Sequence, residues 1–506
     1  MLNTVGYSVL IEQHELAARP LLVSARIDAK IKGRETQRSV DQDVLVFEPK
    51  YQPKDSLVGH LQFALRYEGI NLEVLSLLFQ KTGKDELNTW MRVSPTSIYA
   101  RRAGFLFEWL TGETLEPNVP PKTRYADLVD NEIQFGLKKG ESDIRFRVNN
   151  NLPGNKDFCP MVRRTEYLSE MVENDLREKI RDTLKEYDDD LLRRAATYLY
   201  LRETQSSFEV EREKPSADRA QRFVDLLRQT DTKAPLTEER LVELQQAVID
   251  PRFHEFTWRQ EQNWVGKDLG NRNQIDFVPT RPEDLPTLMS GLLSLAEQSR
   301  CNNTEEIDSN YDMQIDPVIL ATTIAFGFVF IHPFMDGNGR IHRYLIHEVL
   351  ANAGFTPRGI VLPVSAVILA NLNDYVSILE VFSKPLRNLT NYNPDTPDIP
   401  ATGNDAVYFS YFDATYQAEF LYRALVRTVE EDLEKEISYL LGFDKAYKAL
   451  NDLLDWPAHR LELFIRVVQQ NDGSLSQKKY DSHFDWMKKE EIEEAAKRVV
   501  EAFKIN

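Results

Sequence analysis

The chain has 506 residues, a length that is typical of about three domains and allows a sizeable buried core. Hydrophobic residues make up 42% of the sequence and charged residues 28%, which excludes a wholly disordered or fibrous protein. The chain contains 62 Lys and Arg against 80 Asp and Glu, so its net charge is −18. This acidity disfavours broad electrostatic binding to nucleic acid or to an anionic membrane.

Cysteine content and hydropathy indicate the compartment. The chain has two cysteines, Cys159 and Cys301, which excludes a disulfide framework and fits a reducing compartment. Met1–Leu10 lacks the basic start of a signal peptide. The most apolar stretch, Pro317–Ile331, falls short of the ~20 residues that span a bilayer and predicts a buried helix with Asp316 as its N-cap. We therefore expect a cytoplasmic protein that does not cross a membrane.

The first 112 residues are expected to form a small α/β scaffold or recognition domain. The run Asp43–Phe47 predicts a strand, because it is apolar and rich in β-branched residues. Helical patterns follow at Leu57–Tyr67 and at Ser97–Leu110, where Gly112 is the expected C-cap. This section holds no cluster of side chains that suggests chemistry.

Residues 113–190 are expected to form a connecting region. Apolar and charged residues alternate over Ile144–Val148, which predicts a half-buried strand that ends in a turn at 149–151. From Tyr167 onward the pattern is strongly helical.

Residues 191–390 are expected to form a helical domain with one hairpin. A helix is predicted over Leu191–Glu211; Pro215 ends it and Ser216 starts the next one. Two short apolar segments, at 263–265 and 275–278, flank Gly270 and Asn271, which supply turn chemistry.

The remaining sequence is expected to form a Pro-rich linker and a helical C-terminal domain. The linker, 391–407, contains Pro394, Pro397 and Pro400. Residues 408–506 are charge-rich, and Glu490–Phe503 reads as an amphipathic helix that packs on its neighbours. The predicted fold is therefore mainly α.

The segment from His332 to Arg343 carries the clearest chemical signal, with the sequence HPFMDGNGRIHR. A loop presents His332 and Asp336 after a long apolar helix, and the glycines that follow allow successive N–H groups to face one anion. The start of a new helix adds its positive dipole end. The segment therefore predicts a phosphate site at which Asp336 can hold a divalent cation and His332 can act as a base.

Two arginines extend this predicted site. Arg340 and Arg343 lie three residues apart, on one side of the new helix, and predict two guanidinium clamps for phosphate oxygens. Phe334 is expected to anchor the loop in the core. A zinc site is not supported by the Cys and His spacing, and His342 and His347 are expected to be packing or surface residues.

The same segment resembles the motif of the Fic family, H-x-F-x-[DE]-G-N-G-R-x-x-R, at every fixed position. The resemblance covers about 191–390 and implies an all-α core around this loop. It also implies transfer of AMP from ATP to a protein hydroxyl, because Gly339 is similar to the AMP-transferring branch, whereas a phosphorylating branch has lysine there.

The resemblance implies a role for each motif residue. His332 would be the general base, and Asp336 would hold Mg²⁺. Arg340 and Arg343 would hold the outer phosphates. The anion hole for the transferred phosphate would be formed by Gly337, Asn338 and Gly339.

Two further segments resemble family features. The residues Asn263, Trp264, Val265 and Gly266 are similar to a flap that binds the target backbone as an added strand. The alternative is a surface hairpin with one packed Trp. Tyr375 lies where the family places an aromatic near adenine, and the alternative is that it packs in the core.

An earlier helix resembles the family's inhibitory pattern, [ST]-x-x-x-E-[GN]. Here it reads Ser207-x-x-x-Glu211-Arg212, with Arg212 in place of Gly or Asn. The resemblance implies that Glu211 pairs with Arg343 and denies it to the γ-phosphate, in the class whose inhibitory helix precedes the motif. The alternative is the charged, solvated face of an ordinary helix.

The predicted function is an autoinhibited protein adenylyltransferase that uses ATP and Mg²⁺ and modifies a Ser, Thr or Tyr hydroxyl of a protein target, itself included. A second interpretation is an enzyme that removes AMP, with Glu211 positioning water. A third, non-catalytic interpretation is an ATP-sensing regulator. The sequence leaves the target and the oligomeric state open, a homo-oligomer included.

Overall fold

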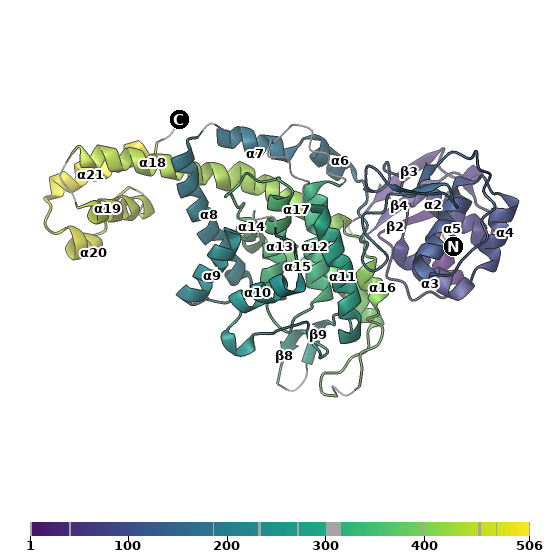
Figure 1. Cartoon of the computed structure of the whole chain (residues 1–506). Helices are drawn as coiled ribbons and strands as arrows, with labels where there is room; N and C mark the ends of the chain where they lie inside the picture. Colours follow the sequence, from purple (N-terminus) through teal and green to yellow (C-terminus); the bar gives the residue numbers. More distant parts are fainter. Residues whose placement is uncertain are drawn as a thin grey trace.

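The computed structural model describes residues 3–39, 42–185, 187–230, 234–270, 273–299, 315–396, 399–453, 457–471 and 473–504. The fold is mainly α-helical, as predicted, with three small sheets among the described residues. The chain is elongated: the N-terminal section lies at one end, the helices around the motif lie in the middle, and the last helices lie at the other end (Figure 1).

In the part of the N-terminal section that the structure describes, a four-stranded sheet is combined with five α-helices. The strands occur in the order β1-β2-β4-β3, and the β2–β4 pair is parallel. The predicted strand, the predicted helices and the C-cap at Gly112, with φ +72°, are all confirmed. The elements are β1 (Asn3–Val5), α1 (Tyr7–Gln13), β2 (Val23–Ile27), β3 (Arg34–Arg38), β4 (Asp43–Phe47), α2 (Leu57–Tyr67), α3 (Leu72–Thr82), α4 (Asp85–Val93) and α5 (Ile98–Thr111).

A second small sheet contains β5 (Ala126–Asp127), β6 (Glu141–Asp143) and β7 (Val148–Asn150). The predicted strand over Ile144–Val148 is wrong, because 144–147 form the turn between β6 and β7. The side chain of Asp143 accepts a hydrogen bond from the backbone N–H of Phe146 at 2.8 Å and stabilises this turn. Asn149 and Asn150 consequently lie in a strand rather than in the predicted turn.

The central helices surround the motif. The predicted helix start at Asp316 is confirmed: its side chain accepts hydrogen bonds from Val318 N and Ile319 N. The predicted hairpin is also confirmed, although Asn271 lies outside the described residues, as does Cys301. The elements are α6 (Glu166–Glu173), α7 (Leu176–Lys185), α8 (Asp189–Val210), α9 (Ala217–Leu227), α10 (Glu238–Val248), β8 (Val265–Asp268), β9 (Asn273–Phe277), α11 (Leu285–Ala296), α12 (Pro317–Ile331), α13 (Asn338–Asn352), α14 (Val364–Ala370) and α15 (Leu372–Leu389).

The last described helix, α21, is amphipathic, as predicted. Ile492, Ala496 and Val499 on α21 are buried in a cluster with residues of α18 and α19. A π-helical turn, Thr428–Leu433, joins α17 to α18. The elements are α16 (Ala406–Ser410), α17 (Thr415–Arg427), α18 (Glu434–Asn451), α19 (Ala458–Gln470), α20 (Gln477–Lys479) and α21 (Lys489–Ala502).

The hydrophobic cores do not follow the predicted domain ranges. The core around Tyr7 continues to Met161, well beyond residue 112. The core that contains α12 and α13 continues through the predicted boundary at 408 to Ile437. Within the predicted linker, Asn404 is buried and donates to the carbonyl of Pro279 at 2.8 Å. Closely spaced prolines interrupt helices and strands, but these interruptions do not coincide with the boundaries of the hydrophobic cores.

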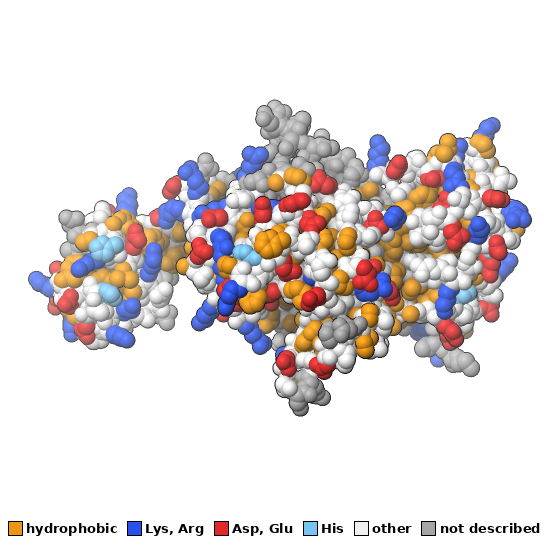
Figure 2. All heavy atoms as spheres, turned by 60° about the horizontal axis from the view of Figure 1, so that its bottom comes forward, with side chains coloured by type: hydrophobic (Ala, Val, Ile, Leu, Met, Phe, Trp, Pro, Cys, Tyr) orange, Lys and Arg blue, Asp and Glu red, His pale blue; other side chains and the backbone are white. Residues whose placement is uncertain are grey.

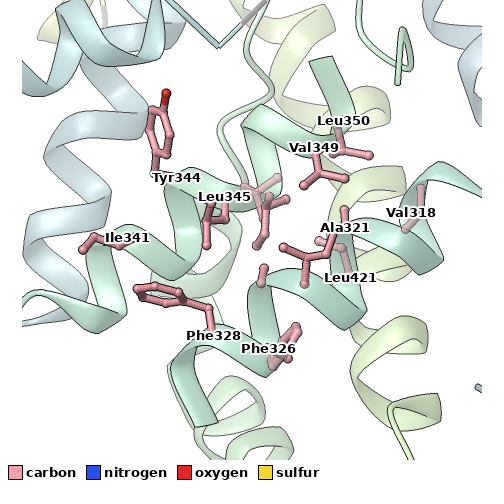
Figure 3. Close-up of a cluster of buried hydrophobic side chains, with 14 of the residues drawn as sticks. Val318, Ala321, Phe326, Phe328, Ile341, Tyr344, Leu345, Val349, Leu350 and Leu421 are labelled. Atoms are coloured by element: carbon pink, nitrogen blue, oxygen red, sulfur yellow. The ribbon is translucent and has the colours of Figure 1, made fainter. Parts of the chain in front are cut away.

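The two helices that flank the motif, α12 and α13, pack against each other within the central core. Phe326 and Phe328 on α12 lie close to Ile341 and Leu345 on α13, and Leu421 on α17 closes one side (Figure 3). Each of these side chains is almost completely buried. The motif loop therefore joins two helices that are fixed against each other.

The surface is charged and mixed in sign. Acidic and basic side chains are interspersed across the face drawn in Figure 2. Among the helices that the structure describes, none is by itself long and apolar enough to cross a membrane; α14 and α15 pass such a test only as a pair that is bent by 95°.

Candidate active site

The loop between α12 and α13 presents His332 in an unusual backbone conformation. His332 is the C-cap of α12 and has φ +56° and ψ +60°, a left-handed conformation that is costly for a non-glycine residue. Its Nδ1 lies 3.1 Å from the carbonyl oxygen of Val329. A carbonyl can only accept, so Nδ1 carries the proton and Nε2 keeps a free lone pair. Burial lowers the pKa of His332 to about 4, so the ring is neutral near pH 7.

Arg259 holds this strained loop in place. Its Nε donates to the carbonyl oxygen of His332 at 2.9 Å, and its backbone N–H donates to the carbonyl oxygen of Pro333 at 2.9 Å. Nη1 donates to the carbonyl of Glu261 at 2.8 Å, so one side chain ties the loop to the segment that leads into the hairpin. Arg259 was not identified from the sequence, because nothing local distinguishes it from other arginines.

The motif's Asn and Phe fix the other half of the loop. The side-chain amide of Asn338 donates to the carbonyl of Phe334 at 2.7 Å and accepts from the N–H of Phe334 at 3.1 Å. Phe334 is fully buried and packs against Trp258, as the predicted anchor. The side chain of Asn338 thus stabilises the loop, and its backbone N–H, in the first turn of α13, is a donor for the predicted anion hole. Gly337 has φ +95°, a conformation that favours glycine.

Helix α13 begins next to His332 and carries both arginines inward. Its first backbone N–H groups have no partner within the helix, and the dipole places partial positive charge there. Arg340 is 4% exposed, and its Nη1 donates to the carbonyl of Val248 at 3.0 Å. Arg343 is 1% exposed; its Nε donates to Oγ of Ser207 at 3.0 Å and its Nη2 donates to the carbonyl of Ser207 at 2.7 Å.

The carboxylate of Glu211 lies on this helix start. Its Oε1 accepts from Nη2 of Arg343 at 2.9 Å. The same oxygen lies 2.2 Å from the position that a Cβ on Gly339 would occupy, so the carboxylate covers the first turn of α13. Burial acts to raise the pKa of Glu211, but Arg343, with Arg340 beside it, holds this pKa below its usual value. Glu211 is therefore an anion at the place where the sequence predicts phosphate.

Helix α8 ends in a Schellman motif that aims this carboxylate. Glu213 N donates to the carbonyl of Phe208 at 3.0 Å, and Arg212 N donates to the carbonyl of Glu209 at 2.8 Å. Arg212 has φ +57°, the left-handed position that Gly or Asn usually fills. The sequence predicted a helix to Glu211, whereas the helix ends at Val210 and Glu211 is its C-cap.

Asp336 is at the tip of the loop, and its side chain is 63% exposed. Its Oδ1 accepts from Gly337 N at 2.6 Å and from Nη2 of Arg340 at 3.2 Å. The backbone N–H of Met335, one residue earlier, donates to Glu255 at 2.9 Å. One exposed carboxylate beside an anion site is a donor set that suits Mg²⁺ bridging phosphates. No group of three or more His, Cys, Asp and Glu that could hold a metal is found in the described ranges.

The hairpin lies beside the motif loop. Asn263 is buried, and its Nδ2 donates to the carbonyl of Met335 at 3.0 Å. Trp264 is half-buried, and Val265 is 41% exposed at the start of β8. Within the described sheet, β8 pairs with β9 and its other edge has no strand beside it. At Gly266 a Cβ would lie 1.9 Å from the carbonyl oxygen of Gln274, so the strands approach too closely for a larger residue.

Tyr375, which is predicted to lie near adenine, is a buried residue of α15. It is 4% exposed, and its ring lies between those of His342 and Phe420, at centroid distances of 6.1 and 5.9 Å. Tyr375 thus packs in the core beside Arg343, and its place near adenine stays a prediction. His342 and His347 are also buried, and Nε2 of His347 lies 2.9 Å from Oε1 of Glu203.

The residues around this loop match a known family. Residues 235–350 match the Fic/DOC family. The chain carries a Fic domain. The fly Drosophila willistoni has a "Protein adenylyltransferase Fic" that is 30% identical over 128 residues, which are 25% of this chain and 22% of that protein. The nematode Caenorhabditis briggsae has a "Protein adenylyltransferase fic-1" that is 32% identical over 123 residues, 23% of this chain and 20% of that protein.

The sequence similarity to these two relatives covers about a quarter of the chain. The matched segment spans about a fifth of the length of these curated relatives. A solved Fic family protein from Desulfovibrio desulfuricans G20 aligns with 66% of this chain and 84% of its own, at 18% identity and a TM-score of 0.37. A Fic domain containing signaling protein from Bacteroides thetaiotaomicron aligns with 52% of this chain and 96% of its own, at 20% identity and a TM-score of 0.33.

Proposed function

We propose that this chain is a protein adenylyltransferase that moves AMP from ATP to the hydroxyl of a Ser, Thr or Tyr side chain of a protein, itself included. The observation that supports this most is the position of His332. Its Nε2 carries a free lone pair, and the helix that starts six residues later, at Asn338, carries two buried arginines. A base beside a phosphate site is the arrangement that phosphoryl and nucleotidyl transfer require.

In this proposal His332 acts as the general base. Its Nε2 accepts the proton of the target hydroxyl while that oxygen bonds to the α-phosphorus of ATP. The bond between the α-phosphorus and the oxygen that bridges to the β-phosphate breaks, and pyrophosphate leaves. The N–H groups at the start of α13 stabilise the charge on the transferred phosphate, while Arg340 and Arg343 bind the outer phosphates.

Asp336 is the residue that would hold Mg²⁺, with the phosphates as further ligands. The bound ion would neutralise phosphate charge. The carboxylate is suited to this because it is exposed while its neighbours keep it oriented.

The hairpin would position the target. An extended target segment could add to the open edge of β8 and bring its hydroxyl to His332. Asn263 supports this arrangement, because it bonds the base of the hairpin to the motif loop.

Glu211 would inhibit the resting enzyme. Its carboxylate and the γ-phosphate are both anions that would bind the same face of Arg343, so they exclude each other. Ser207 would support the inhibited state by holding the same guanidinium from the helix backbone.

The proposal is tested by incubating full-length protein with ATP and MgCl₂ and measuring its intact mass. Because the resting enzyme is expected to be inhibited, the other substitutions are made in the Glu211→Gly variant. We expect Glu211→Gly to gain the mass of one AMP. The rate of this gain is expected to fall by about 10²–10⁴-fold when His332→Ala is combined with Glu211→Gly. His459→Ala is the matched control, because that histidine is exposed on α19. Equal rates with and without His332 would overturn the proposed mechanism.

A further inference from the structure

A second acidic side chain binds the other arginine of the site. Oε2 of Glu213 contacts Nη1 of Arg340, and Oε1 of the same carboxylate accepts from Nη1 of Arg219 at 2.7 Å. Glu213 belongs to no motif position considered in the sequence. We propose that Glu213 is a second competitor for the triphosphate, closing Arg340 as Glu211 closes Arg343; this rests on the proposed function.

The two carboxylates are placed by one turn of backbone. The Schellman motif reverses the chain at Arg212, so Glu211 and Glu213 both return towards α13. Three residues thus deliver two carboxylates to two guanidinium groups. A shift of this turn would release both arginines together.

Arg340 would keep its place if Glu213 left. It also donates to the carbonyl of Val248 at 3.0 Å and to Oδ1 of Asp336 at 3.2 Å, and it is 4% exposed. The side chain of Glu213 is 34% exposed and can swing into solvent. The arginine is therefore the fixed partner and the glutamate the movable one, which is what an exchange of carboxylate for phosphate needs.

The contact between Glu213 and Arg340 limits how much inhibition is relieved when Glu211 is removed. Without Glu211, Arg343 loses its anionic partner and keeps its bonds to Ser207, but Arg340 still pairs with Glu213. A charge-assisted bond must then be broken before the outer phosphates reach both arginines. Glu211→Gly should consequently relieve only part of the inhibition, and loss of both carboxylates should relieve more.

Nucleotide binding to the full-length chain tests this directly, with ATP and AMP as probes and titration calorimetry as readout. Glu213→Gln keeps the size of the side chain and removes the charge. It is expected to bind ATP about tenfold more tightly than wild type and to bind AMP with unchanged affinity, because AMP lacks the outer phosphates. Glu211→Gln with Glu213→Gln should bind ATP more tightly than either single variant. Glu209→Gln, on the exposed face of α8, is the matched control and should resemble wild type.

These measurements separate the inference from the proposed function, because binding needs no transfer. Tighter ATP binding in Glu213→Gln would support the inference even if no variant transferred AMP, whereas the proposed function would then fail. Glu213→Asp is a second variant for the case that Glu213→Gln does not fold; it retracts the carboxylate from Arg340 and should tighten ATP binding by a smaller factor. Wild-type ATP affinity in the folded variants, or an equal gain for AMP and ATP, would overturn the role of Glu213.

Discussion

Nε of Arg259 lies 2.9 Å from the carbonyl oxygen of His332, and the backbone N–H of Arg259 lies 2.9 Å from the carbonyl oxygen of Pro333. A buried arginine thus binds two successive carbonyls of a loop whose first residue is in a left-handed conformation. Burial lowers the pKa of this arginine to about 10, so it still carries its charge near pH 7. The orientation of His332 depends on this contact.

Arg259→Ala should therefore damage both stability and activity. It removes the hydrogen bonds to three carbonyls, one of them buried and two part-buried, which should lower the free energy of unfolding by about 3 kcal/mol. Arg259→Lys keeps the charge but cannot reach three acceptors in one plane. We expect it to fold, to bind ATP, and to lose more than tenfold in kcat for AMP transfer. Denaturant unfolding and single-turnover kinetics check this, and wild-type kcat in Arg259→Lys would contradict the positioning role.

Arg212→Gly should stabilise the protein, although most substitutions by glycine within a helix destabilise it. The φ of +57° is costly for arginine and free of that cost for glycine, so we expect a gain of about 0.5–1 kcal/mol. Glu209→Gly lies within the same helix and should lose about 1 kcal/mol. Unfolding midpoints of the two variants in one denaturant series check both signs. A loss in Arg212→Gly would show that its side chain matters more than its backbone.

The pH dependence should reveal the buried environment of His332. The neutral base is present above its pKa of about 4 and is lost as the pH falls through that value. An ordinary histidine would instead lose the base around pH ~6.5. In Glu211→Gly the pKa should fall further, because that carboxylate acts to raise it. The acidic limb of kcat/KM for this variant should therefore lie below pH ~5.5, and a midpoint near 6.5 would contradict the assignment.

Asp336→Ala should make AMP transfer very slow while the protein stays folded, because its side chain is exposed and its buried partner Arg340 keeps its contacts with Glu213 and the carbonyl of Val248. Chelation of divalent cations should have the same effect on the enzyme with Asp336 intact, and added MgCl₂ should restore activity. Asp374→Ala, which removes a carboxylate from the first turn of α15, is the control. Undiminished transfer in the presence of a chelator would remove Asp336 from its proposed role.

The sequence predicted those parts of the site that depend on local chemistry. The start of α12 at Asp316 and the anchor at Phe334 follow from spacing and residue type. The contacts of Arg259 and Glu213 join segments that lie 73 and 127 residues apart, so no local pattern indicates them. Hydrophobic periodicity also cannot place Tyr375, because a core position and a ligand-facing position give the same pattern.

The strand predicted over Ile144–Val148 was wrong for a different reason. Its alternation of apolar and charged residues is that of a strand, but the side chain of Asp143 bonds the backbone of Phe146 and closes a turn. Whether a side chain or a neighbouring strand bonds a backbone N–H depends on the positions of the atoms, which the sequence pattern does not give. The end of α8 is a different case, because Arg212 stands where the resembled pattern has Gly or Asn, and it takes the left-handed conformation two residues after the last helical residue, Val210.

The most direct test of the central claim is the intact mass of Glu211→Gly after incubation with ATP and MgCl₂, measured beside Glu211→Gly/Arg343→Ala and Glu209→Gly. We predict that Glu211→Gly gains AMP on a hydroxyl side chain well above wild type, since Arg343 is then free for the γ-phosphate. The double variant should lose this gain, and Glu209→Gly should resemble wild type. If Glu211→Gly gains no AMP, or no more than Glu209→Gly, the claim is contradicted; if it also releases AMP from a modified target more slowly than wild type, removal of AMP becomes the favoured function.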